Sequence, residues 1–370
     1  MVRVLFVSPL GNESSGGIAK WTSNILDFYK KQKNDVELVH CYNSDLVTVF
    51  DGDSLMSRIK KGIQNYLPLY KHVKNYINNG NIDTLHICTS ASISLIKDIA
   101  ILRLAKKNNI RTIVHFHFGR IPTIYKSYNW ERVLMNYVMK IADEIIVMDN
   151  SSYLTLKNKG FSNVHNIPNP LSLETEALIE SNCNKICRQR NKIVFVGQLL
   201  VTKGVFELIN AVKYIHNHNI TIKMIGVCPN KDIMNEIENI AGNDYKNWLF
   251  ITGAIPYESV IKEMLSANVF VLPTYTEGFP NVIIESMACG CPIVTCPVGA
   301  IPEMLNINGN EPCGICVPPK DTEALKNAII NMLENPQQAS VMGKNARDRV
   351  LSEYSIRSVW GKLCCIWNLS

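Results

Sequence analysis

The sequence contains no long uninterrupted apolar run, and this absence argues against a helix that spans a membrane. Its longest uncharged candidate, Ser286 to Pro302, is broken by prolines and glycines. The start of the chain, Met1 to Pro9, carries one charge, on Arg3, and a short apolar run, which is less than a signal peptide needs. We therefore expect a cytoplasmic protein whose chain opens with a strand.

Paired metal-ligand motifs are also missing, although the chain has 12 cysteines. A zinc site is built from two Cys-x-x-Cys units, or from cysteine and histidine at equivalent spacing. Cys313 and Cys316 have this spacing, and no clear second pair accompanies them. We expect buried, reduced thiols, and neither a metal ion nor another cofactor.

The composition is that of a folded protein, because 46% of the 370 residues are hydrophobic and the mean hydropathy is near zero. This length suggests two domains. The charge is uneven: residues 1–170 hold 21 Lys and Arg against 13 Asp and Glu, whereas residues 171–370 hold 17 against 19. An acidic ligand or an anionic membrane surface would meet the basic first half first. We expect no nucleic-acid partner.

Short apolar runs alternate with helical patterns along the first half of the chain. We predict strands at Val2–Val7, Val36–His40, Thr84–Cys88, Thr112–Phe116 and Glu144–Met148, and helices at Ile18–Lys30, Ser92–Lys107 and Trp130–Ala142. This succession indicates a parallel sheet with helices on both faces.

The pattern breaks at Pro168-Asn169-Pro170, followed by a polar segment, Ser172 to Arg190, where we place the hinge. It restarts with strands at Lys192–Val196, Thr221–Ile225, Trp248–Ile251, Asn268–Leu272 and Ile293–Cys296, and a helix at Gly204–His216. The prediction is an α/β fold of two doubly wound, Rossmann-like domains, 1–168 and 169–354, facing a cleft that is the default ligand site. The C-terminal helix, within 355–370, is a candidate to pack back on the first domain.

The most informative segment follows the strand predicted at Asn268–Leu272. A loop with Glu277 comes first, Pro280 suits the first position of a helix, and Gly290 suits its end. A helix start at this place is a ready anion site, because its free backbone N–H groups and its dipole attract negative charge. The residues that would supply or surround these amides are Phe279, Asn281 and Val282.

Two carboxylates flank this predicted anion site. Glu277 lies at its mouth, and Glu285 lies just over one turn inside the helix. Each carboxylate can accept hydrogen bonds from neighbouring hydroxyls, and a nucleotide sugar carries such hydroxyls on either side of its diphosphate. The ordinary alternative is a solvated pair of acids, since this spacing alone is common.

This segment resembles the Glu-x7-Glu signature of retaining GT-B glycosyltransferases of family 4, of the bacterial surface-polysaccharide type. The resemblance is carried by the strand, the Glu-Gly-Phe-Pro-Asn loop, the helix and the Gly-Cys-Pro turn that ends it. The resemblance covers almost the whole chain. It implies that Glu277 touches the donor sugar and that Glu285 holds the ribose. The implied diphosphate contacts are the amides that follow Gly278, in the run Phe279, Pro280, Asn281 and Val282.

A second segment links the strand at Lys192–Val196 to the next helix and contains Lys203. An ammonium group at a strand end can neutralise a diphosphate as a point charge, although a lone lysine in a loop is usually a surface residue. The segment is similar to a Gly-Arg-Leu and Lys-Gly pattern of the family, but Gln198 stands where the family has arginine. Gln198 keeps hydrogen-bond donors and loses the fixed charge, so Lys203 is expected to stabilise more of the leaving group.

The first loop of the chain resembles the family's loop near the donor diphosphate and the acceptor. Gly16 and Gly17 let the backbone approach a ligand closely, and Lys20 follows in the predicted helix. A flexible loop between strand and helix is the ordinary alternative.

Two histidines end the strand predicted at Thr112–Phe116, where the family places a histidine beside the reacting sugar. His117 is the first candidate and His115 the second, and both point the same way if the strand continues. Arg120 is a candidate phosphate contact or a surface residue. One of the two histidines is expected to be structural.

Two further features have competing interpretations. Asp51-Gly-Asp53 matches the short Asp-x-Asp motif of metal-dependent GT-A transferases, and we interpret it as a solvated turn. The apolar residues of a basic helix fall on one stripe: Ile59, Ile63, Tyr66, Tyr70, Val73 and Ile77. Core packing of this stripe is the first interpretation, and peripheral contact of 58–74 with an anionic membrane, on the inner face of the cell membrane, is the second.

These observations predict a metal-independent retaining transferase that moves a hexose or N-acetylhexosamine from a nucleotide sugar, with UDP as the expected nucleotide. The acceptor would be a glycan or a lipid-linked glycan in bacterial polysaccharide biosynthesis. Lys203, the helix start and the first-loop amides would stabilise the leaving diphosphate, with His117 and Glu277 at the reacting sugar. The alternatives are a nucleotide-sugar 2-epimerase of similar architecture and a non-catalytic sugar-nucleotide-binding module.

Overall fold

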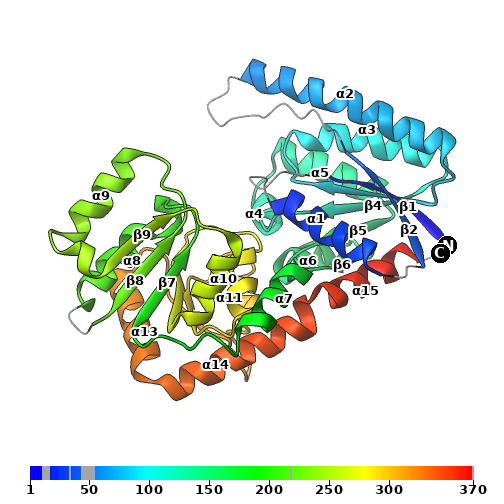
Figure 1. The fold of residues 1–370 in the computed structure, drawn as a ribbon. Helices are drawn as coiled ribbons and strands as arrows, with labels where there is room; N and C mark the ends of the chain where they lie inside the picture. Colours follow the sequence, from blue (N-terminus) through cyan, green and yellow to red (C-terminus); the bar gives the residue numbers. More distant parts are fainter. Residues whose placement is uncertain (11–16, 33–34, 43–54, 217–218, 369–370) are drawn as a thin grey trace. The chain divides into compact units, whose positions relative to one another are not determined.

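The computed structural model (Figure 1) describes residues 1–10, 17–32, 35–42, 55–216 and 219–368, and of 55–59 and 61–63 it describes the backbone. The chain divides into two compact units, each described by itself. Unit 1 comprises Met1–Asn169 and Ile356–Ser370, and unit 2 comprises Pro170–Ser355. Within the described ranges, no helix has both the length and the apolar character needed to cross a membrane.

Unit 1 is built on a parallel sheet of six strands in the order β2-β1-β3-β4-β5-β6. The strands are β1 (Val2–Val7), β2 (Val36–Cys41), β3 (Thr84–Thr89), β4 (Arg111–Phe116), β5 (Glu144–Val147) and β6 (Val164–Asn166). Every residue of β3 is buried, as expected for an inner strand of a parallel sheet covered on both faces. Because the strands are parallel, their carboxyl ends all lie along the same side of the sheet. The strand β2 is one of the two outermost strands.

The helices of unit 1 cover both faces of this sheet. They are α1 (Gly17–Lys30), α2 (Leu55–Asn79), α3 (Ser94–Lys107), α4 (Ile121–Lys126), α5 (Trp130–Ile141), α6 (Asn150–Asn158) and α15 (Ile356–Trp367). The last helix packs on the first, where the rings of Trp360 and Phe28 lie 5.6 Å apart. Arg111 of β4 also donates a 2.6 Å hydrogen bond to the Ile366 carbonyl oxygen.

The apolar stripe of α2 packs into the core of unit 1 along its described part. Val73 and Ile77 are buried there, and Leu69 and Tyr70 are partly buried against the same core. The side chains of Ile59 and Ile63 lie outside the described part. Core packing of the stripe, the first interpretation of this helix, is therefore what the described side chains show.

Unit 2 repeats the design with the strand order β12-β11-β10-β7-β8-β9, all parallel. The strands are β7 (Lys192–Val196), β8 (Thr221–Ile225), β9 (Leu249–Gly253), β10 (Val269–Leu272), β11 (Ile293–Thr295) and β12 (Ile315–Cys316). The helices are α7 (Leu173–Asn182), α8 (Val205–Lys213), α9 (Lys231–Ala241), α10 (Tyr257–Ser266), α11 (Asn281–Ala288), α12 (Ile301–Met304), α13 (Thr322–Glu334) and α14 (Pro336–Arg349), with short turns η1 (Val201–Lys203), η3 (Tyr245–Asn247) and η4 (Val350–Tyr354). Two parallel sheets with alternating helices are the predicted architecture.

The cysteines are all free thiols, and about half of them are buried, among them Cys289, Cys291 and Cys313. Burial raises the pKa of the Cys313 thiol to about 11 and that of Cys296 to about 12. These thiols are therefore protonated near neutral pH and behave as small apolar side chains.

Candidate active site

The loops that follow β7 and β10 cross tightly at the carboxyl edge of the sheet in unit 2. Gly204 has a φ of 70°, and a Cβ on it would lie 2.1 Å from the Pro273 carbonyl oxygen. Only glycine permits both this left-handed backbone and this approach. The Tyr275 amide also donates to the Thr202 carbonyl oxygen over 2.8 Å, so Lys203, between Thr202 and Gly204, is held against the β10 loop.

Lys203 and Glu277, two predicted site residues from different loops, form an ion pair. The Lys203 Nζ and Glu277 Oε1 atoms are 2.5 Å apart, and the side chains are 27% and 12% exposed. The sequence had suggested each residue separately, and nothing in it predicted this contact. The pair places one positive and one negative group side by side at the edge where doubly wound sheets bind ligands.

The Glu277 loop is also fixed from the other side, by the loop after β11. Gly299 has a φ of 57°, and a Cβ on it would lie 2.2 Å from the Glu277 carbonyl oxygen. The Ala300 amide donates to the Gly278 carbonyl oxygen over 2.9 Å. These contacts fix the backbone conformation of Glu277 and Gly278.

Helix α11 begins where the Glu277 loop ends. Its first residue is Asn281, and Pro280 is the N-cap with a ψ of 118°. The prediction that Pro280 occupies the first helical position is wrong by one residue, because this ψ is extended. Gly290, with a φ of 64°, follows the helix end as predicted.

The side chain of Phe279 belongs to the core of unit 2. Its ring is buried and meets the ring of Tyr354 edge-on, with centroids 5.7 Å apart. Val282 lies in the first turn of α11 and is partly exposed. The start of α11 therefore lies four residues after Glu277, at the end of the loop that follows β10.

Glu285 is held by hydroxyl groups that no sequence motif marks as part of the site. The Tyr257 hydroxyl of α10 donates to Glu285 Oε1 over 2.8 Å. The Thr175 hydroxyl lies 2.6 Å from the Tyr257 oxygen, and the Ser172 hydroxyl lies 2.7 Å from the Thr175 oxygen. Burial and the Glu285 carboxylate raise the pKa of Tyr257 far above its usual value, so the phenol stays a donor.

Gln198, which stands where the resemblance implies an arginine, is exposed at the carboxyl end of β7. Its carbonyl oxygen accepts a 2.8 Å hydrogen bond from the Leu200 amide. Gln198 therefore begins the loop that carries Lys203, at the carboxyl edge of the sheet.

In unit 1, His115 and His117 lie on the same face, as the alternation of the strand predicts. Their ring centroids are 3.9 Å apart, and both rings meet Trp21, at 4.9 and 4.7 Å respectively. His115 is 0% exposed and belongs to the core of unit 1. His117 is partly exposed, and its amide donates to the Thr89 carbonyl oxygen over 2.9 Å.

Burial keeps these histidines neutral. It lowers the pKa of His86 and His117 to about 3, with the charge of His86 as a further cause for His117, and it lowers that of His115 well below 6.5. A neutral imidazole at His117 can donate or accept a hydrogen bond at pH 7, and it cannot supply a fixed positive charge.

One cluster has the composition of a metal site. His86, Cys88 and His115 place ligand atoms within 4.8 Å of one another. However, Trp367 Nε1 donates a 3.0 Å hydrogen bond to His86 Nδ1. Because indole is a donor only, the proton of neutral His86 must be on Nε2, and neither nitrogen has a free lone pair. The Trp367 contact therefore argues against metal binding at this cluster.

The other predicted site residues of unit 1 are glycines, a lysine and an arginine. Gly17 starts α1, and Lys20 is partly exposed in its first turn. Arg120 forms a bidentate pair with Glu131, with 2.7 and 2.5 Å contacts, so its charge has an internal partner. Gly16, Asp51 and Asp53 lie outside the described residues.

The chain is similar to known glycosyltransferases in sequence and in fold. The family model of glycosyl transferases group 1 matches residues 180–349. The capsular polysaccharide biosynthesis glycosyltransferase CapM of Staphylococcus aureus is 25% identical over 369 residues, covering 93% of this chain and 92% of CapM.

Two solved structures share the fold. Sucrose-phosphate synthase from Thermosynechococcus elongatus matches with a TM-score of 0.73 at 20% identity, over 99% of this chain and 98% of that one. HepE from Anabaena, solved with UDP-glucose, matches with a TM-score of 0.69 at 16% identity over 99% of both chains. These likenesses confirm the predicted GT-B fold class. The group 1 domain and the relatives named as glycosyltransferases make the chain a glycosyltransferase, as predicted.

Proposed function

We propose that this glycosyltransferase moves a hexose or N-acetylhexosamine from a UDP-sugar, with retention of configuration and without a metal ion, to a glycan or lipid-linked glycan. The similarity to CapM, a glycosyltransferase of capsular polysaccharide biosynthesis, supports a role in building a bacterial surface polysaccharide. The complex of HepE with UDP-glucose supports UDP as the nucleotide of the donor.

The observation that carries the proposal is the Lys203–Glu277 pair beside the start of α11 in unit 2. The ammonium group of Lys203 would bind the donor diphosphate, and the carboxylate of Glu277 would accept hydrogen bonds from the donor sugar. Negative charge builds on the leaving diphosphate in the transition state. Lys203 and the first amides of α11 are fixed donors for that charge, which is the form of catalysis that costs no reorganisation during reaction.

The second carboxylate binds the far side of the donor. Glu285 would accept hydrogen bonds from the ribose hydroxyls, with one oxygen already oriented by Tyr257 over 2.8 Å. A carboxylate fixed in this way loses less freedom when the ribose binds. Gln198 would add a hydrogen bond to the donor without adding charge.

Unit 1 would supply the acceptor side. Gly17 and Lys20, at the start of α1, and His117, at the end of β4, are the residues proposed to face the acceptor and the reacting sugar. The neutral His117 would hydrogen-bond a sugar hydroxyl. The exposed lysines Lys60, Lys71 and Lys74 of α2 are proposed to contact an anionic membrane surface peripherally.

The test is a transfer assay with UDP-, GDP- and ADP-sugars and a lipid-linked glycan fraction as acceptor, with the product anomer read by NMR. The proposal expects UDP release that depends on the acceptor, and a product with the donor's anomeric configuration, in the presence of a chelator. Conversion of the free donor into its 2-epimer would indicate the epimerase instead. Inverted product, or activity that the chelator removes, would contradict the proposed mechanism.

A further inference from the structure

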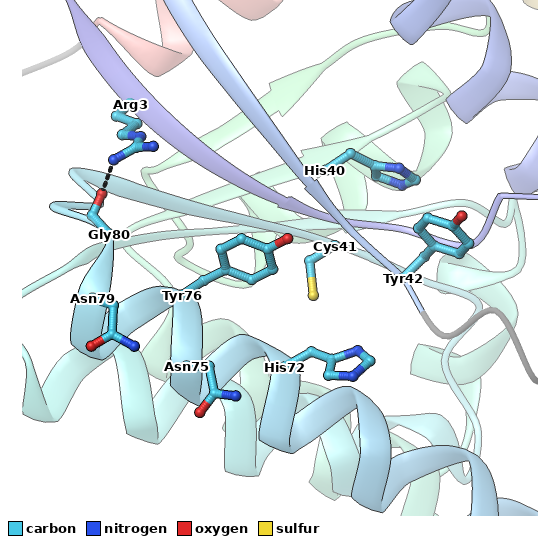
Figure 2. A pocket seen from close by; sticks show the side chains of 9 residues that line it. All are labelled: Arg3, His40, Cys41, Tyr42, His72, Asn75, Tyr76, Asn79 and Gly80. Atoms are coloured by element: carbon cyan, nitrogen blue, oxygen red, sulfur yellow. Dashed lines mark hydrogen bonds between the residues drawn. The ribbon is translucent and has the colours of Figure 1, made fainter.

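A pocket of about 550 Å³ lies in unit 1 between the edge strand β2 and the second half of α2 (Figure 2). We call it the α2–β2 pocket. Its lining residues are Arg3, His40, Cys41, Tyr42, His72, Asn75, Tyr76, Asn79 and Gly80. The volume is in the range of pockets that bind small organic ligands.

One face of α2 lines this pocket. His72, Asn75, Tyr76 and Asn79 recur at helical spacing on one side of the helix. All four are exposed, whereas Val73 and Ile77, on the neighbouring stripe, are buried in the core. The helix therefore uses one stripe for packing and turns another toward the pocket.

The chemistry of the described lining excludes several ligand classes. None of these lining residues is aliphatic, which disfavours a lipid tail, and none is acidic, which disfavours a cation. The guanidinium group of Arg3 is engaged by the Gly80 carbonyl oxygen and by Glu37, 3.0 Å away. Burial is the main cause that lowers the pKa of His40, so this imidazole is neutral at pH 7 and offers an anion no charge.

Amides and aromatic faces remain, and these groups recognise neutral sugars. Asn75 and Asn79 each bring two donors and an acceptor that match vicinal hydroxyls. Tyr76 and Tyr42 are 40% and 38% exposed, so their rings can cover the apolar face of a pyranose. His40 stacks on Tyr42, with centroids 5.0 Å apart and planes inclined by 13°, which holds the Tyr42 ring in place.

The pocket adjoins the ligand-binding edge of the sheet. Cys41 and Tyr42 also line a second, smaller pocket of about 150 Å³ at the carboxyl ends of β1, β2 and β3, beside Val7 and Cys88. Doubly wound sheets bind ligands at this edge. A ligand seated at the strand ends can therefore continue along α2 without leaving the surface of unit 1.

We propose that the α2–β2 pocket binds the neutral sugar units of the acceptor glycan that precede the unit being extended. This inference rests on the proposed function for the identity of the acceptor. It assigns Asn75 and Asn79 to sugar hydroxyls and Tyr76 to a pyranose face. The enzyme then prefers an oligosaccharide acceptor over a single sugar, because additional units occupy this pocket.

The test measures binding of neutral oligosaccharides of different lengths, released from bacterial capsular polysaccharides, to the full chain on a glycan array, followed by titration of the best ligand. The expected result is tighter binding of longer glycans, and a loss of about tenfold in affinity for Tyr76→Ala and for the double variant Asn75→Ala/Asn79→Ala. Asn78→Ala is the matched control, since Asn78 is exposed on the same helix and does not line the pocket.

Binding of UDP, measured as the rise in melting temperature that UDP causes, separates this inference from the proposed function. All variants are expected to retain the wild-type rise with UDP and the wild-type melting temperature without it. Equal glycan binding by wild type and Tyr76→Ala, or no glycan bound by the wild type, contradicts the pocket assignment. Glycan binding that depends on Tyr76, with no turnover of any nucleotide sugar, would leave the pocket standing and contradict the proposed function.

Discussion

Lys203 is the residue whose removal is expected to cost the most activity. Lys203→Ala leaves the Glu277 carboxylate without its 2.5 Å partner, next to where the diphosphate of the donor would bind. Loss of one fixed group that stabilises transition-state charge costs about 10²–10³-fold in turnover. We expect a decrease of this size in UDP release at saturating donor. Lys246→Ala, an exposed lysine elsewhere in unit 2, is the control and should match wild type.

Tyr257 is expected to act through Glu285. Tyr257→Phe removes the 2.8 Å hydrogen bond to the carboxylate, and a bond to a charged group contributes about 1.5–3 kcal/mol. The donor KM should therefore rise about tenfold or more, while turnover at saturating donor stays near wild type. The same substitution in a Glu285→Ala background should have no further effect on KM, which a merely structural role would not predict. Tyr214→Phe, an exposed tyrosine of unit 2, is the control.

Contacts between individual side chains were the features that could least be predicted from the sequence. Glu277, Lys203 and Gly290 could be predicted because the sequence around each of them has a recognisable pattern. Tyr257 could not be predicted, because it follows Pro256 at an ordinary helix start. It contacts Glu285 only through the packing of α10 on α11. The ion pair of Lys203 with Glu277 was equally out of reach, since the two residues lie 74 positions apart.

At the scale of elements, the crossing of two loops at Gly204 is expected to be needed for stability. Gly204→Ala would force a left-handed backbone on alanine and place its Cβ 2.1 Å from the Pro273 carbonyl oxygen. The backbone strain alone costs about 1–2 kcal/mol, and the clash adds to it. We expect a lower urea midpoint for unit 2 together with lost donor turnover. Gly361→Ala, in α15 with open space around it, should leave both unchanged or slightly stabilise unit 1; equal behaviour of the two variants would contradict the crossing's role.

The histidines of β3 and β4 are expected to make unit 1 sensitive to acid. The pKa of His86 is 6.5 when unfolded and about 3 when folded, so the unfolded chain binds more protons between these values. Stability is therefore complete above pH 6.5 and is lost as the pH falls toward 3. At pH 5 the loss from His86 is about 2 kcal/mol, from 1.36 kcal/mol per pKa unit.

Urea unfolding at pH 7 and pH 5, followed by tryptophan fluorescence, measures this effect, since Trp21 and Trp367 both lie against His86. His86→Gln keeps an acceptor for Trp367 Nε1 and cannot be protonated, so it should flatten the pH dependence. The exposed His72, replaced by Gln, should leave it as in wild type. An unfolding free energy that does not change between the two pH values would contradict the burial argument.

Elements were predictable where burial imposes a pattern. β1, β7 and β8 have the predicted bounds, because each is a continuous apolar or periodic run, and α15 lies within the predicted range 355–370. The helix α7 was not predicted, because its sequence is polar and its stability comes from the Ser172 cap and from packing on α10. The strands β6 and β12 are three and two residues long, too short to show a period.

At the scale of the whole molecule, the two-sheet architecture followed from the succession of strands and helices, and the similarity to GT-B structures confirms it. The donor residues Lys203, Glu277 and Glu285 all belong to unit 2. The basic excess of the chain lies in residues 1–170, in unit 1. We therefore propose that unit 2 binds the nucleotide and that unit 1 binds the acceptor.

Thermal unfolding with and without UDP tests directly whether the loops of unit 2 bind the nucleoside diphosphate of the donor. A ligand at one hundred times its dissociation constant stabilises the folded state by about 2.7 kcal/mol, which corresponds to a rise of several degrees for a unit of this size. We expect UDP to raise the melting temperature of the wild type and of Lys246→Ala. We expect no such rise in Lys203→Ala or in Glu285→Ala. A wild type that no nucleoside diphosphate stabilises, or a Lys203→Ala and Glu285→Ala pair that UDP stabilises as much as wild type, would contradict this expectation.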